Sequence, residues 1–312
     1  MKILNMDEEI KVLREVECNL CHGREVRVIY PSTVNPQADQ KFECDCTNDG
    51  HGEYYQLVRC RNCGLQYSSP RPDFSIIEDS YEEVQDEMYK EEVQGRIKTF
   101  QRNLKNIERY QKTGKLLDVG CSMGVFLSEA VKKGWQVEGL EPSLWCVQQG
   151  EKLFNLRINQ GTVRNLKDLF KEEFDVVTMW DVLEHVDDPM ETLKLCRNVL
   201  KKEGLFVFST VDMGSLFARM MGKKWPWLMK MHIYYFDRKN IRQYLEKAGF
   251  EVLSIEVYKH TISFDYLLYK IKKLNSLAYS FLSLIRKTFP FLSRFYVNVA
   301  MGDFMIVYAK KI

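Results

Sequence analysis

Short apolar runs alternate with amphipathic stretches along the chain beyond residue 112. Runs rich in β-branched and aromatic residues predict strands. They cover residues 115–119, 136–140, 174–179, 205–211, 251–257 and 304–309. Apolar positions three and four residues apart follow most of these runs and predict helices. Repeated strand–helix units with apolar strands form a mostly parallel sheet with helices on both faces, so we predict an α/β fold.

Capping residues locate three of the predicted helices. Ser143 follows the second strand and is expected to cap the next helix. Asp188, followed by proline, predicts the start of another helix, whose apolar positions we expect to continue to Leu200 before Gly204 ends it. Asp237 and Gly249 predict the two ends of a later helix.

Overall charge is balanced, but its distribution divides the chain into regions. With 45 basic and 43 acidic residues the net charge is only +2, which argues against nucleic acid as a partner. Residues 73–94 are strongly acidic and residues 261–300 strongly basic. We predict a cysteine-bearing head over 1–70, an acidic helical connector over 71–112 and an αβ body over 113–312.

Nothing in the sequence indicates export or a membrane span. The first residues are acidic where a secretory signal would be apolar. The longest charge-free apolar stretch, 274–285, is shorter than the roughly 18–20 residues that a spanning helix needs. We expect a cytoplasmic protein; the oligomeric state stays open.

Four of the nine cysteines form two Cys-x-x-Cys pairs, Cys18 with Cys21 and Cys60 with Cys63. In a reducing compartment this spacing indicates metal rather than disulfides. Two such turns build a tetrahedral all-sulfur site that suits structural Zn²⁺ and leaves no open position for catalysis. Four other residues could replace a ligand or form a second site: His22, Cys44, Cys46 and His51.

A glycine-containing turn joins the first body strand to its helix. Asp118 lies at the end of the strand, and Gly120 and Gly124 follow it. Glu141 ends the next strand, where an acid can bridge the two hydroxyls of a ribose. The turn alone is a weak signal, because many nucleotide sites use one.

This succession of motifs resembles that of the class I S-adenosylmethionine-dependent methyltransferases that have a small N-terminal zinc ribbon. Asp118, Gly120 and Gly124 match their D-x-G-x-G-x-G motif, with Ser122 in place of the middle glycine. A serine there must take φ below zero or accept strain. Further matches, in order, are Cys63-Gly-Leu, Pro70-Arg-Pro, Tyr81, Phe174-Asp-Val-Val, Trp180-Asp-Val-Leu-Glu-His-Val, His232-Ile-Tyr-Tyr-Phe and Leu245-Glu-Lys-Ala-Gly-Phe.

The resemblance implies a Rossmann-like sheet of seven strands, the last one antiparallel, that binds S-adenosylmethionine. Amides of the 120–124 turn would meet the methionine carboxylate, and Glu141 the ribose hydroxyls. The remaining implied contacts are Pro142, Thr162 and the Val163 amide at adenine, and Trp180 and Asp181 near the methionine part.

Two histidines are candidates for the catalytic base. His185 follows the fourth strand, at the edge where open α/β sheets bind ligands. His232 lies in an aromatic-rich segment, 213–236, which we interpret as a lid with substrate contacts. Either histidine could instead be a packing residue.

The basic segment 261–300 has amphipathic helical spacing and precedes the last strand. One interpretation is a helical pair that covers the active site. The other is a patch for peripheral contact with the inner face of a membrane that holds a lipid-linked substrate.

These features together predict a methyltransferase for a small-molecule acceptor, most simply a hydroxyl of a sugar or another metabolite in a cell-surface or secondary-metabolite pathway. The alternative enzyme is a methyltransferase of ribosomal RNA bases with a zinc head. The acidic connector and the absence of a basic head argue against nucleic acid as a partner. A non-catalytic zinc-ribbon adaptor is the alternative from another class.

Overall fold

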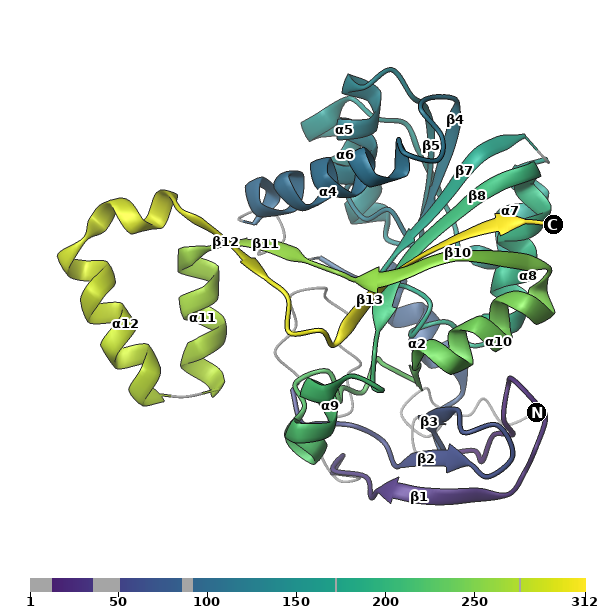
Figure 1. Cartoon of the computed structure of the whole chain (residues 1–312), viewed down its shortest axis with the longest axis horizontal. Helices are drawn as coiled ribbons and strands as arrows, with labels where there is room; N and C mark the ends of the chain where they lie inside the picture. Colours follow the sequence, from purple (N-terminus) through teal and green to yellow (C-terminus); the bar gives the residue numbers. More distant parts are fainter. Residues whose placement is uncertain (1–12, 36–50, 86–91, 172, 275) are drawn as a thin grey trace, which may run out of the picture.

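The computed structural model describes residues 13–35, 51–85, 92–171, 173–274 and 276–312. Its central element is a sheet of seven strands (Figure 1). The strands are β4 Lys115–Val119, β5 Gln136–Glu141, β6 Ile158–Gln160, β7 Phe174–Trp180, β8 Leu200–Val211, β10 Phe250–Val257 and β13 Phe304–Lys311. Their order across the sheet is β10-β13-β8-β7-β4-β5-β6.

Five neighbouring strands, from β6 to β8, run parallel, and β13 lies antiparallel to both β8 and β10. The predicted α/β fold, with seven strands and an antiparallel last strand, is therefore confirmed. The six strands expected from apolar runs all occur. The short β6 was not expected from its own sequence, because only Ile158 of its three residues is buried.

Both faces of the sheet are covered by helices. Successive residues of one strand enter different cores: Leu116 and Val176 pack on one side, Leu117 and Val177 on the other. Helices α4 Val93–Ile107, α5 Val125–Lys132 and α6 Leu144–Phe154 cover the first side, and α7 Leu166–Leu169, α8 Pro189–Val199 and α10 Arg238–Ala248 the second (Figure 1). The inner strands β4, β7 and β13 are thus mainly apolar, because both of their faces are buried.

The capping predictions are confirmed with one exception. Ser143, Asp188 and Asp237 each accept a hydrogen bond from the backbone of the helix they cap, and Gly249 ends α10 with φ of 83°. The expected end of α8 was wrong. The helix stops at Val199 and β8 already begins at Leu200, because Leu200 pairs with Phe174 and the residues before Leu205 bulge out of register.

A smaller sheet links the N-terminal head to the body. Its strands are β1 Val26–Tyr30, β2 Leu57–Cys60, β3 Gln66–Ser68 and β9 Tyr234–Tyr235, in that order. The first three belong to the predicted 1–70 head, whereas β9 comes from the predicted 213–236 lid and pairs with β3. The lid also holds α9 Leu216–Met221 and η2 Gly222–Lys224, and the connector holds α2 Phe74–Glu82.

The basic insertion forms a helical pair on a two-stranded ribbon. β11 His260–Ser263 and β12 Tyr296–Val299 pair antiparallel at its base. Between them lie α11 Phe264–Leu274, α12 Ser276–Thr288 and η3 Pro290–Arg294. In Figure 1 the two helices project away from the central sheet. Over the ranges that the structure describes, no helix has both the length and the apolar character to cross a membrane.

Candidate functional site

A cavity of about 610 Å³ opens at the carboxyl ends of the parallel strands, where open α/β sheets place their ligands. Apart from Gly124, the residues predicted for cofactor binding or catalysis all line it, although they come from five separate segments. They are Asp118, Gly120, Ser122, Glu141, Pro142, Thr162, Val163, Trp180, Asp181, His185 and His232.

Glu141 lies at the end of β5 with its carboxyl group buried in the cavity wall. Its Oε2 accepts a hydrogen bond of 2.8 Å from the Ser122 N–H, and its Oε1 one of 3.0 Å from the Ser143 N–H. Burial raises the pKa of Glu141 to about 7, and these two hydrogen bonds oppose the shift. The carboxylate is therefore held in one orientation, with acceptor capacity left for a diol.

Asp118, at the end of β4, lines the cavity and has one carboxyl oxygen without a hydrogen-bond partner among the described residues. Its Oδ1 accepts a hydrogen bond of 2.7 Å from the Thr178 hydroxyl. Its Oδ2 is buried and has no hydrogen-bond partner among the described residues. Burial raises its pKa to about 7. A buried carboxyl oxygen of this kind fits the ammonium group of a bound amino acid.

The turn after β4 has a left-handed backbone at three positions. Gly120, Ser122 and Gly124 have φ of 71°, 50° and 75°. Ser122 thus accepts strain rather than a negative φ, the second of the two outcomes that its sequence allowed. Gly124 lies outside the cavity wall, at the N-cap of α5, where a Cβ would stand 2.6 Å from Leu156 Cδ1.

The predicted adenine end is formed by Pro142 and by the turn at residues 161–165. Thr162 caps η1 Val163–Asn165: its Oγ1 accepts from the Arg164 N–H, and its own N–H donates to Asn165 Oδ1 over 2.9 Å. This capping box fixes the Thr162–Val163 edge that lines the cavity.

Trp180 and Asp181 close the far side of the turn. The Trp180 ring is buried and stacks on Tyr258 at 16° between the ring planes. Asp181 has φ of 54°, and its Oδ1 accepts a hydrogen bond of 2.6 Å from Ser209 Oγ. Both residues line the cavity between the glycine turn and the histidines.

His185 and His232 lie together, with their ring centroids 4.7 Å apart. His185 Nδ1 is 2.9 Å from the Met231 carbonyl oxygen and 2.8 Å from the Tyr81 hydroxyl, while His232 Nδ1 is 2.9 Å from the Trp227 carbonyl oxygen. Burial lowers the pKa of His185 to about 4 and that of His232 well below its usual value. Both rings are therefore neutral at pH 7.

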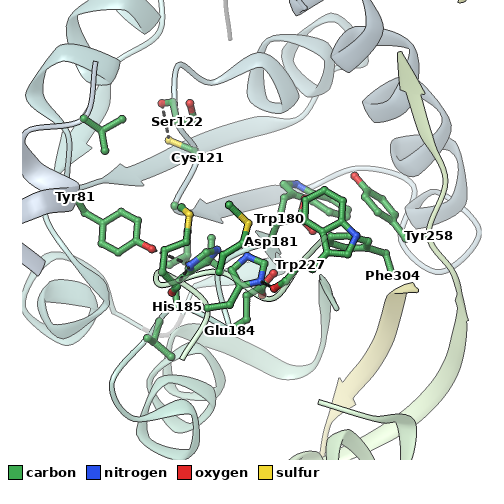
Figure 2. Close-up of a pocket in the computed structure, with 18 of the residues that line it drawn as sticks. Tyr81, Cys121, Ser122, Trp180, Asp181, Glu184, His185, Trp227, Tyr258 and Phe304 are labelled. Carbon is green, nitrogen blue, oxygen red and sulfur yellow. Dashed lines mark hydrogen bonds between the residues drawn. The ribbon is translucent and has the colours of Figure 1, made fainter. Parts of the chain in front are cut away.

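Glu184 completes this group, and sequence reasoning assigned it no role. The side chain is fully buried, and its Oε2 accepts a hydrogen bond of 2.8 Å from the Thr210 hydroxyl. Burial, with the nearby charge of Asp181, raises its pKa to about 8. Figure 2 shows Tyr81, Glu184 and His185 on one side of the pocket, and Trp180, Tyr258 and Phe304 on the other.

The lid is tied to the body over the cavity. The indole N–H groups of Trp225 and Trp227 both donate to Asp303 Oδ2, over 3.0 and 2.9 Å. Lid residues 227, 229, 231 and 232 contribute side chains to the cavity wall. The end of the cavity that holds the two histidines is thus built partly by the lid.

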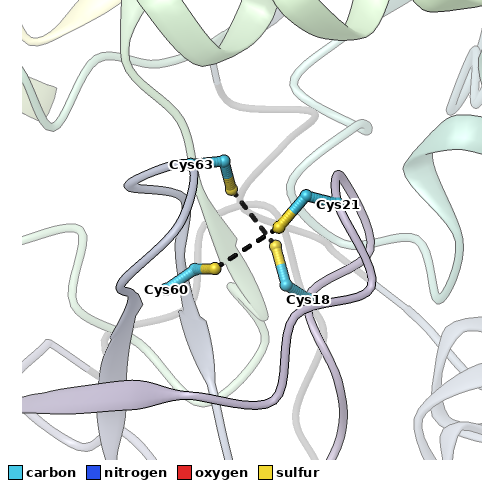
Figure 3. A group of neighbouring side chains, drawn as sticks. All are labelled: Cys18, Cys21, Cys60 and Cys63. Atoms are coloured by element: carbon cyan, nitrogen blue, oxygen red, sulfur yellow. Dashed lines mark hydrogen bonds between the residues drawn. The ribbon is translucent and has the colours of Figure 1, made fainter.

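The four predicted metal ligands lie in one cluster in the head (Figure 3). The sulfurs of Cys18 and Cys63 are 3.3 Å apart, those of Cys21 and Cys60 are 3.5 Å apart, and all four lie within 4.8 Å of one another. None of the four forms a disulfide. Zn–S bonds of about 2.3 Å put tetrahedral sulfurs about 3.8 Å apart, so this donor set fits Zn²⁺.

The alternative ligands are in part excluded by position. The exposed His22 ring faces Glu17 at 3.2 Å, and His51 Nδ1 is 2.7 Å from the Pro226 carbonyl oxygen at the cavity. Neither belongs to the cysteine cluster. Cys44 and Cys46 lie outside the described residues.

A family model described as "Methyltransferase domain" matches residues 89–255, more than half of the chain. The chain belongs to this family of methyltransferases.

Curated relatives match over a shorter stretch. A "Ubiquinone biosynthesis O-methyltransferase" from Pseudomonas fluorescens is 36% identical over 111 residues, which are 34% of this chain and 48% of that protein. One of the same description from Histophilus somni is 33% identical over 107 residues, 31% of this chain and 45% of that protein. The match thus spans about half the length of these relatives.

Solved structures also align with the chain. A SAM-dependent methyltransferase from Archaeoglobus fulgidus is 19% identical and aligns with a TM-score of 0.48. The alignment covers 77% of this chain and 100% of that one. One from Thermotoga maritima is 22% identical, with 70% and 91% covered and a TM-score of 0.46. Likenesses at this level carry no information on the acceptor.

Proposed function

We propose that the protein transfers the methyl group of S-adenosylmethionine to a hydroxyl of a small molecule. The observation that carries the proposal is the single cavity in which Asp118 and Glu141 lie at one end and Glu184, His185 and His232 at the other. The names of the curated relatives include O-methyltransfer, which favours a hydroxyl acceptor over a base of RNA.

The cofactor end fits the two polar parts of S-adenosylmethionine. Glu141 would accept hydrogen bonds from the ribose hydroxyls, and the free oxygen of Asp118 would pair with the ammonium group. The methionine carboxylate would meet the amides of the 120–124 turn at the start of α5. When bound, the cofactor supplies a methyl group on a positively charged sulfur, which an oxygen nucleophile attacks in line.

The acceptor end holds the hydroxyl and prepares it for attack. His232 and His185 are the catalytic candidates, because their neutral rings can interact with the hydroxyl proton or oxygen. The lid forms part of the wall at this end through Trp227 and positions His232. Holding the oxygen in line with the methyl group is the main contribution that such a site makes to rate.

Two further parts belong to the same proposal. The cluster of Cys18, Cys21, Cys60 and Cys63 would hold a structural Zn²⁺. The insertion over 261–300 would make peripheral contact with an anionic membrane. Phe281 and Leu284 on α12 are 65% and 63% exposed, beside Lys287 and Arg286.

The experiment is a screen of hydroxyl-bearing acceptors, sugars and phenols first, by production of S-adenosylhomocysteine. With the acceptor that reacts, we expect His232→Ala to lower turnover at least tenfold while S-adenosylmethionine affinity stays unchanged. Wild-type turnover in this variant would remove His232 from the mechanism. Methylation of ribosomal RNA, but of no small molecule, would favour the other class of acceptor.

A further inference from the structure

The acceptor end holds more ligating groups than a general base requires. Glu184, His185 and His232 each bring one ligand atom, a carboxylate oxygen or a ring nitrogen, and these atoms lie within 4.8 Å of one another. Glu184 and His232 are buried, and all three line the cavity. They come from two segments, the turn after β7 and the lid, so the lid completes the group.

Both imidazoles are oriented in the way that metal ligands are. Nδ1 of His185 and Nδ1 of His232 lie 2.9 Å from the carbonyl oxygens of Met231 and Trp227. A carbonyl can only accept, so each Nδ1 carries the proton and donates; the Tyr81 hydroxyl, 2.8 Å from His185 Nδ1, then accepts from the same N–H. The lone pair is then on Nε2 of each ring. Histidine ligands to metals are generally held by such a second hydrogen bond to a carbonyl.

The carboxyl group of Glu184 has one held oxygen and one unused oxygen. Oε2 accepts from the Thr210 hydroxyl over 2.8 Å. Oε1 is buried and lacks a hydrogen-bond partner within the described parts of the chain. A buried polar atom without a partner is costly, and a cation beside it would remove that cost.

We infer that Glu184, His185 and His232 hold a divalent first-row transition-metal ion that binds the acceptor oxygen. Two imidazoles and one carboxylate suit Mn²⁺, Fe²⁺, Co²⁺ or Zn²⁺, whereas Mg²⁺ and Ca²⁺ prefer oxygen ligands alone. Three protein ligands leave coordination positions open towards the cavity, as in catalytic metal sites.

This inference rests on the proposed function and adds to it how the hydroxyl is activated. A cation at the oxygen lowers the pKa of the hydroxyl, as it does for bound water. The proton leaves to solvent, and an oxygen lone pair forms the bond to the methyl carbon. The carbon–sulfur bond breaks with its electrons left on sulfur, which gives a methyl ether and S-adenosylhomocysteine. His185 and His232 then act as ligands rather than as bases.

The test is titration of the zinc-loaded full chain with Mn²⁺, with free Mn²⁺ followed by electron paramagnetic resonance. Mn²⁺ competes poorly for thiolates, so the cysteine cluster keeps its zinc. We expect one Mn²⁺ per chain, and at least tenfold weaker binding in His232→Ala and in Glu184→Gln. Thr210→Val removes only the hydrogen bond to Glu184 and should weaken binding about tenfold.

His260→Ala is the matched control, a histidine that lines the same cavity outside the cluster, and it should bind Mn²⁺ as the wild type does. Titration of each variant with S-adenosylmethionine reports whether it is folded. Absence of Mn²⁺ binding by a wild-type protein that binds S-adenosylmethionine would overturn the inference and leave the imidazoles as bases. So would equal Mn²⁺ binding in all variants. A wild-type protein that does not bind S-adenosylmethionine would instead contradict the proposed function.

Discussion

The carboxyl group of Glu141 accepts a hydrogen bond of 2.8 Å from the backbone N–H of Ser122. This contact joins the end of β5 to the turn after β4, so the acid proposed to bind the ribose and the turn proposed to bind the methionine part are held as one unit. Ser122 takes φ of 50° in that turn. A serine is disfavoured there, and the hydrogen bond to Glu141 offsets part of the strain.

Folding stability of the unliganded protein should fall as pH rises from about 4 to about 8 because of Asp118 and Glu141. Burial raises the pKa of both to about 7, whereas unfolded carboxyl groups titrate near 4. Between these values the folded state binds more protons, so deprotonation favours unfolding. We expect melting temperatures measured against pH to decline less in Asp118→Asn and Glu141→Gln. An unchanged slope in both variants would show that neither acid titrates this way.

Ser122→Gly should stabilise the protein by up to about 1 kcal/mol, because glycine takes a positive φ without strain. Chemical denaturation measures the change. The opposite substitution at the same turn, Gly124→Ala, should destabilise the protein by at least about 1 kcal/mol. The φ of residue 124 is 75°, and the Cβ of an alanine there would meet Leu156. Destabilisation by Ser122→Gly would mean that the serine side chain contributes more than its backbone costs.

Removal of the proposed Zn²⁺ from the cysteine cluster should loosen the lid as well as the head. β3 of the head pairs with β9 of the lid, and the Asn240 side chain of α10 donates to the Cys63 carbonyl oxygen over 3.2 Å. We expect a chelator to increase hydrogen exchange in residues 57–68 and 231–236. Exchange in β4, Lys115–Val119, serves as the internal control and should stay slow. Lid peptides that keep their protection would show that the head melts alone.

The insertion should bind anionic vesicles, and less strongly in high salt. Exposed Phe281, Leu284 and Phe291 supply apolar contact, and nearby bases supply attraction to the lipid headgroups. Cosedimentation with vesicles of anionic lipid and with vesicles of neutral lipid separates the electrostatic attraction from the apolar contact. Phe281→Ser with Leu284→Ser should reduce binding severalfold without loss of S-adenosylmethionine affinity. An absence of sedimentation at low salt would end the membrane proposal.

Local sequence predicted most of the fold because local physics determines it. The inner strands are mainly apolar on both faces, so runs such as 115–119 stand out, and caps such as Ser143 act within a few residues. The end of α8 and the existence of β6 depend on pairing with distant strands, Phe174 with Leu200 and Gly139 with Ile158. Residue patterns along the chain do not contain those pairings.

The two ends of the candidate site also differ in how far the local sequence predicts them. The proposed cofactor end follows a compact pattern, an acid, a turn and a second acid after the next strand, so the sequence alone was enough to propose Asp118 and Glu141. The acceptor end brings the lid onto the turn after β7, and the role of Glu184 becomes visible only when His232 lies beside it. The signal that was present is its place directly before His185, after a buried strand.

Calorimetric titration of the zinc-loaded protein with S-adenosylmethionine, for the wild type and for Glu141→Ala, tests directly whether Glu141 binds the cofactor. We predict micromolar binding by the wild type, and at least tenfold weaker binding by the variant, because the carboxylate would no longer accept the ribose hydroxyls. Equal affinity in the two proteins would contradict the assignment of this end of the cavity to the cofactor.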